Sequence, residues 1–185
     1  MKLLENKALC VILMVVLIIS GTYLGGFKGL NGLYNDSTSV FFTGDRGDGI
    51  CVANDLSQRA SAAVNLVTIA SNFPALQQEC EAVSQAATQL QNALTSQDIA
   101  AASVSNQNLQ SAFTSLYQVL ADQALSDTQE QYREKLYATF RSCGETISHD
   151  SYNQYAQAYN DAVSSFPASL LAAVTPAPSQ ASVFY

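Results

Sequence analysis

The chain has 185 residues and a formal net charge of −7, with 15 acidic side chains, 8 basic side chains and a single histidine. Residues 29–185 carry five of the basic and fourteen of the acidic side chains, a net charge of −9. Such an acidic surface repels phosphate backbones, so we expect no nucleic-acid binding. Four cysteines without a CxxC spacing and one histidine offer no metal-ligand pattern, so we expect no metal site and no cofactor.

The first segment is an apolar run, residues 8–27, which contains no charged side chain and lies between Lys7 and Lys28. A helix of this length spans the ~30 Å hydrocarbon core of a bilayer. We predict an uncleaved single-pass anchor in contact with membrane lipid. The alternative is a signal peptide, but no small-x-small site follows the run: a cut after Ser20 would place the bulky Ile18 three residues before the break.

The charges on either side of this run indicate an orientation. Lys2 and Lys7 precede the run, and only Lys28 follows it closely. The positive-inside rule therefore favours a cytoplasmic N-terminus at the cell membrane and an extracytoplasmic body.

Glycine dominates the next segment. Eight of the nine glycines lie within residues 21–49, and glycine is costly inside helices. We therefore predict a glycine-rich juxtamembrane connector over residues 28–49, after an anchor domain of residues 1–27. The connector ends in a tight loop, Gly44–Gly49, whose Arg46-Gly47-Asp48 spells an integrin-type tripeptide that we interpret as a turn.

From residue 50 the apolar residues recur every three or four positions, with almost no strand pattern. Long helices joined by short connectors predict an all-α fold, in which the transmembrane helix precedes an antiparallel four-helix bundle over residues 50–174 and an irregular tail over residues 175–185. The expected buried positions are Leu56, Ala60, Ala63, Val67 and Ala70; Leu76, Cys80, Val83, Ala87, Leu90 and Leu94; Ile99, Ala102, Leu109, Phe113, Leu116 and Leu120; Tyr132, Leu136, Phe140, Cys143 and Ile147; and Tyr155, Tyr159, Ala162 or Val163, and Phe166.

Polar residues indicate where the helices begin. Ser96 or Asp98 is a candidate N-cap, and Ser126 followed by Gln129 predicts a capping box. The polar stretch 103–107 interrupts an apolar stripe, which indicates a weak point or a bend in that helix.

Two further groups have competing interpretations. We interpret Cys80 and Cys143 as buried apolar side chains, and a disulfide between them stays open for an exported body. His149 is the one candidate for a catalytic base. Its neighbours Asp150 and Ser151 project about 100° apart on a helix, so the group does not form a relay. We interpret Asp150 or Ser148 as a local cap or as the cause of a kink.

The chain resembles the LemA family in an ordered set of short motifs. The C-terminal motif reads Tyr-Asn, Tyr-Asn, Phe-Pro; a Tyr-Asn pair follows the anchor; and an arginine precedes Asn-Leu-Val. The matching residues are Tyr34, Asn35, Arg59, Asn65, Leu66, Val67, Ile147, Tyr152, Asn153, Tyr159, Asn160, Phe166, Pro167, Leu170, Ala172 and Phe184. The glycine-rich loop, the absence of tryptophan and Val64 in place of a proline mark a divergent branch. The resemblance implies a membrane-anchored, four-helix-bundle-like body without assigned catalytic residues.

The tyrosines and asparagines of this signature form the one candidate interaction face. Asn153 and Asn160 are seven residues apart and so share one side of a helix. They either bond to neighbouring helices or to the chain termini, or they line a groove for a partner peptide. The candidate face comprises Tyr34, Asn35, Arg59, Asn65, Tyr152, Asn153, Tyr159, Asn160, Phe166 and Pro167.

Together these observations favour a non-catalytic helical scaffold or protein-interaction module at the bacterial cell envelope, with an unidentified protein partner. Self-association of the alanine- and glutamine-rich helices stays open. The alternatives are a module that binds a solute or a peptide in the bundle, and an enzyme that uses His149.

Overall fold

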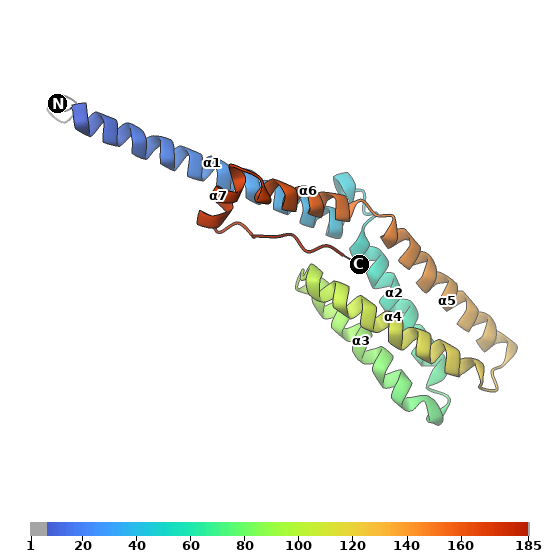
Figure 1. The fold of residues 1–185 in the computed structure, drawn as a ribbon. Helices are drawn as coiled ribbons and strands as arrows, with labels where there is room; N and C mark the ends of the chain where they lie inside the picture. Colours follow the sequence, from blue (N-terminus) through green and yellow to red (C-terminus); the bar gives the residue numbers. More distant parts are fainter. Residues whose placement is uncertain (1–6, 185) are drawn as a thin grey trace. The chain divides into compact units, whose positions relative to one another are not determined.

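The computed structural model describes residues 7–184, apart from the side chains of Ala8 and Arg46. Lys2, with the rest of the predicted leader, and Tyr185 lie outside the described residues. The regular secondary structure of the described range is helical, as the sequence predicts (Figure 1). The helices are α1 (Lys7–Thr43), α2 (Val52–Ala70), α3 (Gln77–Thr95), α4 (Ile99–Ala121), α5 (Asp127–Ser148), α6 (Tyr152–Ser164) and α7 (Ala168–Val174), with 3-10 turns at Asp45–Gly47 and Pro74–Leu76.

The chain forms two compact units. One contains residues 39–153 together with residues 182 onward, and the other contains the residues up to Thr38 together with Gln154–Ala181.

The first unit is a helical bundle. Helix α2 packs against α3 and α5, and α3 packs against α4. The apolar stripes predicted for α3 and α4 are buried, apart from the half-buried Leu94. Residues spaced three and four positions apart lie on one face of a helix, which here faces the core. Each predicted helix start also holds: Asp98 accepts from the Ala101 N–H at 2.9 Å, and Ser126 and Gln129 form a capping box.

The polar stretch 103–107 does not interrupt its helix. Helix α4 runs without interruption from Ile99 to Ala121, and Ser105 and Asn106 are buried within it. Asn106 has a partner on another helix, Arg59 of α2, so a polar residue at this position satisfies a buried hydrogen bond.

The buried face of α5 begins one residue later than predicted. Tyr132 is 56% exposed, whereas Arg133 is 7% exposed. The Arg133 guanidinium lies 4.2 Å over the Tyr117 ring, pairs with Glu130 at 2.7 Å and Glu134 at 2.9 Å, and donates to the Tyr117 carbonyl. These partners allow an arginine to be buried where the apolar pattern predicts a tyrosine.

Residues 28–43, which we expected to belong to a connector, continue helix α1. The irregular segment is only the loop from Gly44 to Cys51, with a 3-10 turn at Asp45–Gly47. Gly44, Gly47 and Gly49 in this loop have positive φ, where other residues are strained. The glycine cost within α1 is offset by a buried face, to which Leu30, Ser37, Val40 and Phe41 belong.

Helices α5 and α6 are separate elements. Helix α5 ends at Ser148, and Asp150 Oδ1 accepts from the Tyr152 N–H at 2.7 Å at the start of α6. The interpretation of Asp150 as a local cap is thus confirmed.

The buried face of α6 also differs from the predicted stripe. Tyr155 is 38% and Phe166 82% exposed, while the buried positions are Tyr152, Ala156, Tyr159 and Val163. The predictions for Tyr155 and Phe166 were therefore wrong: Tyr155 lies outside the buried stripe of α6, and Phe166 lies beyond the end of that helix at Ser164. In the second unit, α6 meets α1 through Tyr159 and Tyr34, whose ring centroids lie 5.4 Å apart.

Candidate functional site

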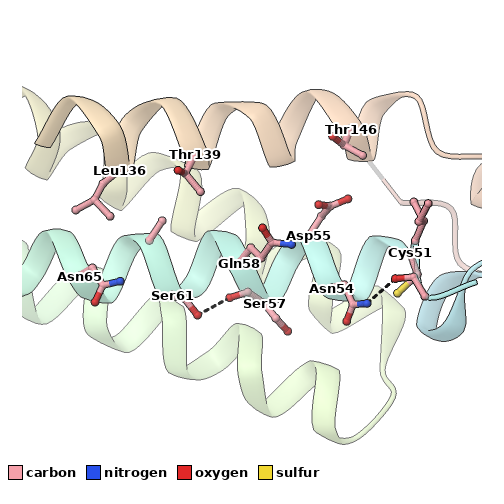
Figure 2. Close-up of a pocket in the computed structure, with 13 residues that line it drawn as sticks. Cys51, Asn54, Asp55, Ser57, Gln58, Ser61, Asn65, Leu136, Thr139 and Thr146 are labelled. Atoms are coloured by element: carbon pink, nitrogen blue, oxygen red, sulfur yellow. Dashed lines mark hydrogen bonds between the residues drawn. The ribbon is translucent and has the colours of Figure 1, made fainter. Parts of the chain in front are cut away.

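An open groove with a volume of about 600 Å³ lies between α2 and α5. Figure 2 shows Asp55 and Gln58 pointing from α2 toward α5, where Leu136, Thr139 and Thr146 face them. The remaining lining residues are Gly49, Ile50, Cys51, Asn54, Ser57, Ser61, Ala62 and Asn65. Hydroxyl and amide side chains therefore dominate a surface with one carboxylate.

Local hydrogen bonds hold the α2 wall of this groove. Asn54 donates from Nδ2 to the Gly49 carbonyl at 2.6 Å, and the Ser61 hydroxyl donates to the Ser57 carbonyl at 2.9 Å. The first of these bonds ties α2 to the glycine loop that precedes it. The groove wall is thus fixed partly by the loop that the sequence analysis identified as a turn.

Burial shifts the pKa values of two groups here, the carboxyl of Asp55, which lines the groove, and the thiol of Cys143 beside it. It raises the pKa of the Asp55 carboxyl, and the charge of Asp150 adds to this rise, while a hydrogen bond from Cys143 opposes it. Burial also raises the pKa of the Cys143 thiol, with the Asp55 charge as a second cause. The Cys143 thiol donates to Gln58 Oε1 at 3.8 Å. These shifts favour the neutral forms of both groups, as desolvation does generally.

A second hollow, of about 540 Å³, is lined by residues of α2, α4 and α5 and by Asn153 and Phe184. Arg59 is 4% exposed here and lies 4.1 Å over the Phe140 ring. It donates to Asn106 Oδ1 at 2.5 Å and to Gln110 Oε1, and its Nε has no partner among the described residues. Burial lowers the pKa of Arg59 to about 10.

The surroundings of Arg59 leave its charge uncompensated within the described part of the chain. Its hydrogen-bond partners are neutral amides, and the nearby Glu145 pairs with Arg141 at 2.9 Å instead. A buried guanidinium without an acidic partner is costly. Such a group is also the side chain best suited to hold a planar carboxylate.

In the bundle unit, the first Tyr-Asn pair of α6 holds the end of the chain. Asn153 donates from Nδ2 to the Phe184 carbonyl at 2.7 Å and accepts from the Phe184 N–H at 2.9 Å. The Tyr152 hydroxyl donates to the Ser182 carbonyl, and the Phe41 ring packs on both Tyr152 and Phe184. Tyr152 and Asn153 thus bind the backbone of the tail, and the Phe184 side chain is buried.

In the other unit, the second Tyr-Asn pair repeats this arrangement. Asn160 donates to the Ala181 carbonyl at 3.0 Å and accepts from the Ala181 N–H at 2.7 Å. The Tyr159 hydroxyl donates to the Pro178 carbonyl. Of the interpretations of these pairs, binding to the C-terminal tail is therefore the one observed. The tail is irregular, as predicted, and side-chain hydrogen bonds hold it.

The other predicted residues have different surroundings, and one of them contacts the second pair. Tyr34 contacts Tyr159, Asn35 is exposed, and Asn65 lines the α2–α5 groove. Phe166 and Pro167 are exposed at the junction before α7, where Pro167 is the N-cap residue.

The remaining candidates are His149, the cysteines and any metal-ligating side chains. His149 is exposed and is the C-cap residue of α5. Cys10, Cys51, Cys80 and Cys143 carry no disulfide, and the last three are buried. The described residues contain no cluster of metal-ligating side chains.

Sequence reasoning missed Asn106, Gln110 and the groove residues of α2 other than Asn65. Asn106 had a signal, since a polar stretch inside an apolar stripe indicates a buried polar partner. The sequence contains no signal for the groove, because the width of the groove depends on how α5 packs on α2.

The chain was compared with known proteins and with protein families. No curated protein and no solved structure matches it. The model of the LemA family matches residues 50–184, which include the whole bundle, both Tyr-Asn pairs and the tail that they hold. Since this match covers most of the sequence, the chain belongs to the LemA family.

Proposed function

We propose that the protein is a non-catalytic, membrane-anchored scaffold whose helical bundle binds another protein of the cell envelope. The observation that carries the proposal is the open groove between α2 and α5. Its lining of hydroxyls, amides and a few apolar groups suits a polypeptide, whose backbone and side chains supply matching donors and acceptors. A highly charged ligand would find little complementary charge there.

The anchor is the second part of the proposal. Helix α1 contains a segment long and apolar enough to cross a membrane, which fits a single anchor or a signal sequence. Val11 to Ile19 are 45–71% exposed in α1, a surface that is stable in lipid. We infer that α1 stays attached and that the bundle lies outside the cytoplasm, which the lysines at the two ends of the apolar run support.

The absence of catalysis is part of the same proposal. His149 is exposed at the end of α5, and Asp150 beside it caps α6. We expect His149→Ala to leave the function of the protein unchanged.

Site-specific photo-crosslinking of the full chain in cells tests partner binding. A photoreactive phenylalanine analogue replaces Ser61 or Asn65, which line the groove, and in a matched control it replaces Gln118, which is exposed on α4. We expect the same crosslinked protein from both groove positions and none from the control position. No product from the groove, equal products from all three positions, or only a crosslinked dimer of the chain itself would contradict the proposal.

The alternative, a module that binds a small solute or a peptide end, is favoured by one observation. Arg59 is buried beside a hollow with its Nε unpaired and no acidic partner among the described residues. A carboxylate is the complementary group. Thermal denaturation of the full chain in detergent with added acetate or succinate tests it: stabilisation that Arg59→Lys weakens supports a carboxylate site, and equal stabilisation of both proteins excludes it.

A further inference from the structure

The second unit presents an apolar surface that its own packing leaves uncovered. Phe166 is 82% exposed, Leu170 62% and Val174 64%. These residues follow one another at intervals of four, and Leu170 and Val174 lie in α7, where this spacing places them on one face. No charged side chain occurs between Ala162 and Phe184. Large apolar side chains gathered in this way mark an interaction surface.

A contact with α1 places α7 along the predicted anchor. Leu171 of α7 packs directly against Gly26, so closely that a Cβ on Gly26 would lie 2.5 Å from Leu171 Cδ1. Gly26 is the second-last residue of the apolar run 8–27, and Lys28 follows that run. If the run spans the bilayer, α7 lies level with the end of the hydrocarbon core, where the acyl chains meet the headgroups.

We propose that α7 is an interfacial membrane helix whose exposed residues Phe166, Leu170 and Val174 insert into the lipid surface beside the anchor. A lipid surface suits these residues better than a protein partner does, because α7 packs on α1 at Gly26, two residues from Leu24, which is 61% exposed in the apolar run. The absence of charge on this segment means that binding needs no anionic headgroup, in contrast to basic amphipathic helices. The proposal rests on α1 as a membrane anchor.

The sequence offers a direct measurement, because the chain contains no tryptophan. Leu170→Trp introduces a single fluorophore on the proposed lipid-facing surface of α7. The full-length variant is reconstituted into phosphatidylcholine vesicles whose acyl chains are brominated either near the headgroup or near the chain end. Bromine quenches tryptophan on contact, so the depth of the side chain can be read from which lipid quenches it.

We expect Leu170→Trp to lose emission intensity in both brominated lipids, more strongly with bromine near the headgroup, and to emit at shorter wavelength than a tryptophan in water. Two matched variants calibrate this result. Val15→Trp reports on the middle of the anchor and should be quenched more strongly by bromine near the chain end. Gln118→Trp, on an exposed position of α4, should not be quenched.

Three outcomes would overturn the proposal. Quenching of Val15→Trp without quenching of Leu170→Trp would place α7 away from the lipid while the anchor is inserted. Short-wavelength emission from Leu170→Trp without quenching would indicate a protein contact in place of lipid. Loss of quenching for Val15→Trp would remove the anchor on which the proposal rests. Val174→Trp is a second reporter on the same face, for use if Leu170→Trp does not fold.

Discussion

Asn153 pairs both edges of its side-chain amide with the backbone of one residue, Phe184. Asn153→Ala removes both hydrogen bonds and leaves two half-buried backbone groups without partners. We expect the free energy of unfolding to fall by about 1–2 kcal/mol and the tail to become sensitive to proteases. Chemical denaturation and limited proteolysis of the full chain measure the two effects. In the control, Asn108→Ala on the exposed face of α4, neither should change.

Asp55 makes stability depend on pH in the acidic range. Burial raises its pKa in the folded chain above the ordinary value of 3.8. Its contribution is fully present below that value and is lost as the pH rises through the higher folded-state pKa. Asp55→Asn carries no charge at any pH, so we expect it to be more stable than the wild type at neutral pH, by roughly 0.5 kcal/mol, and equal to it below pH 3.8.

The measurement for Asp55 is the difference in unfolding free energy between variant and wild type at neutral and at acidic pH. Ser115→Ala, exposed within α4 and without an ionisable group, is the control, and its effect on the unfolding free energy should not depend on pH. A constant difference for Asp55→Asn across this range would mean that the carboxylate is not destabilised by its surroundings.

At the scale of the elements, the capping box at the start of α5 has a measurable contribution. The Gln129 N–H donates to Ser126 Oγ at 3.3 Å, and the Ser126 N–H donates to Gln129 Oε1 at 2.9 Å. Ser126→Ala should lower the free energy of unfolding by about 1 kcal/mol, because the first turn loses a partner for one N–H group. Ser115→Ala, exposed within α4, should have little effect. Equal effects of the two variants in chemical denaturation would contradict a specific role of the cap.

The elements also show which features a sequence pattern can predict. The stripes of α3 and α4 could be predicted because apolar residues at intervals of three and four have one stable arrangement, facing a core. The burial of Arg133 could not be predicted, because it depends on the positions of Tyr117, Glu130 and Glu134 around the guanidinium. The continuity of α1 was missed because glycine propensity is a weak signal that tertiary packing overrides.

The candidate sites, too, could be predicted from the sequence only in part. The two Tyr-Asn pairs were visible as a motif, and their binding of a chain terminus was one of the interpretations considered. Their partners in the tail were not predictable, because residues 21 and 31 positions away meet them only in the folded chain. The spacing agrees in retrospect: seven residues of helix rise about 10.5 Å, and the three residues from Ala181 to Phe184 span about 10 Å when extended.

For the whole molecule, the proposal that α1 is an anchor with the bundle outside the cytoplasm can be tested by cysteine labelling. The native cysteines of the bundle should give little background in such an experiment. Cys51, Cys80 and Cys143 are 1%, 8% and 6% exposed, so a labelling reagent reaches them poorly. Burial also raises the pKa of the Cys80 and Cys143 thiols, which disfavours their reactive thiolate forms. The wild-type chain should therefore label weakly with a membrane-impermeant maleimide, both before and after cells are permeabilised.

Gln118→Cys adds one reactive thiol on the exposed surface of α4. If the N-terminus is cytoplasmic and the bundle is exported, this variant should label in intact cells as strongly as in permeabilised cells. Labelling that requires permeabilisation would place the bundle in the cytoplasm and reverse the orientation that the flanking lysines indicate. That result would also move α7 to the cytoplasmic leaflet without removing its lipid contact, because Leu171 packs against Gly26 whichever way α1 crosses the membrane.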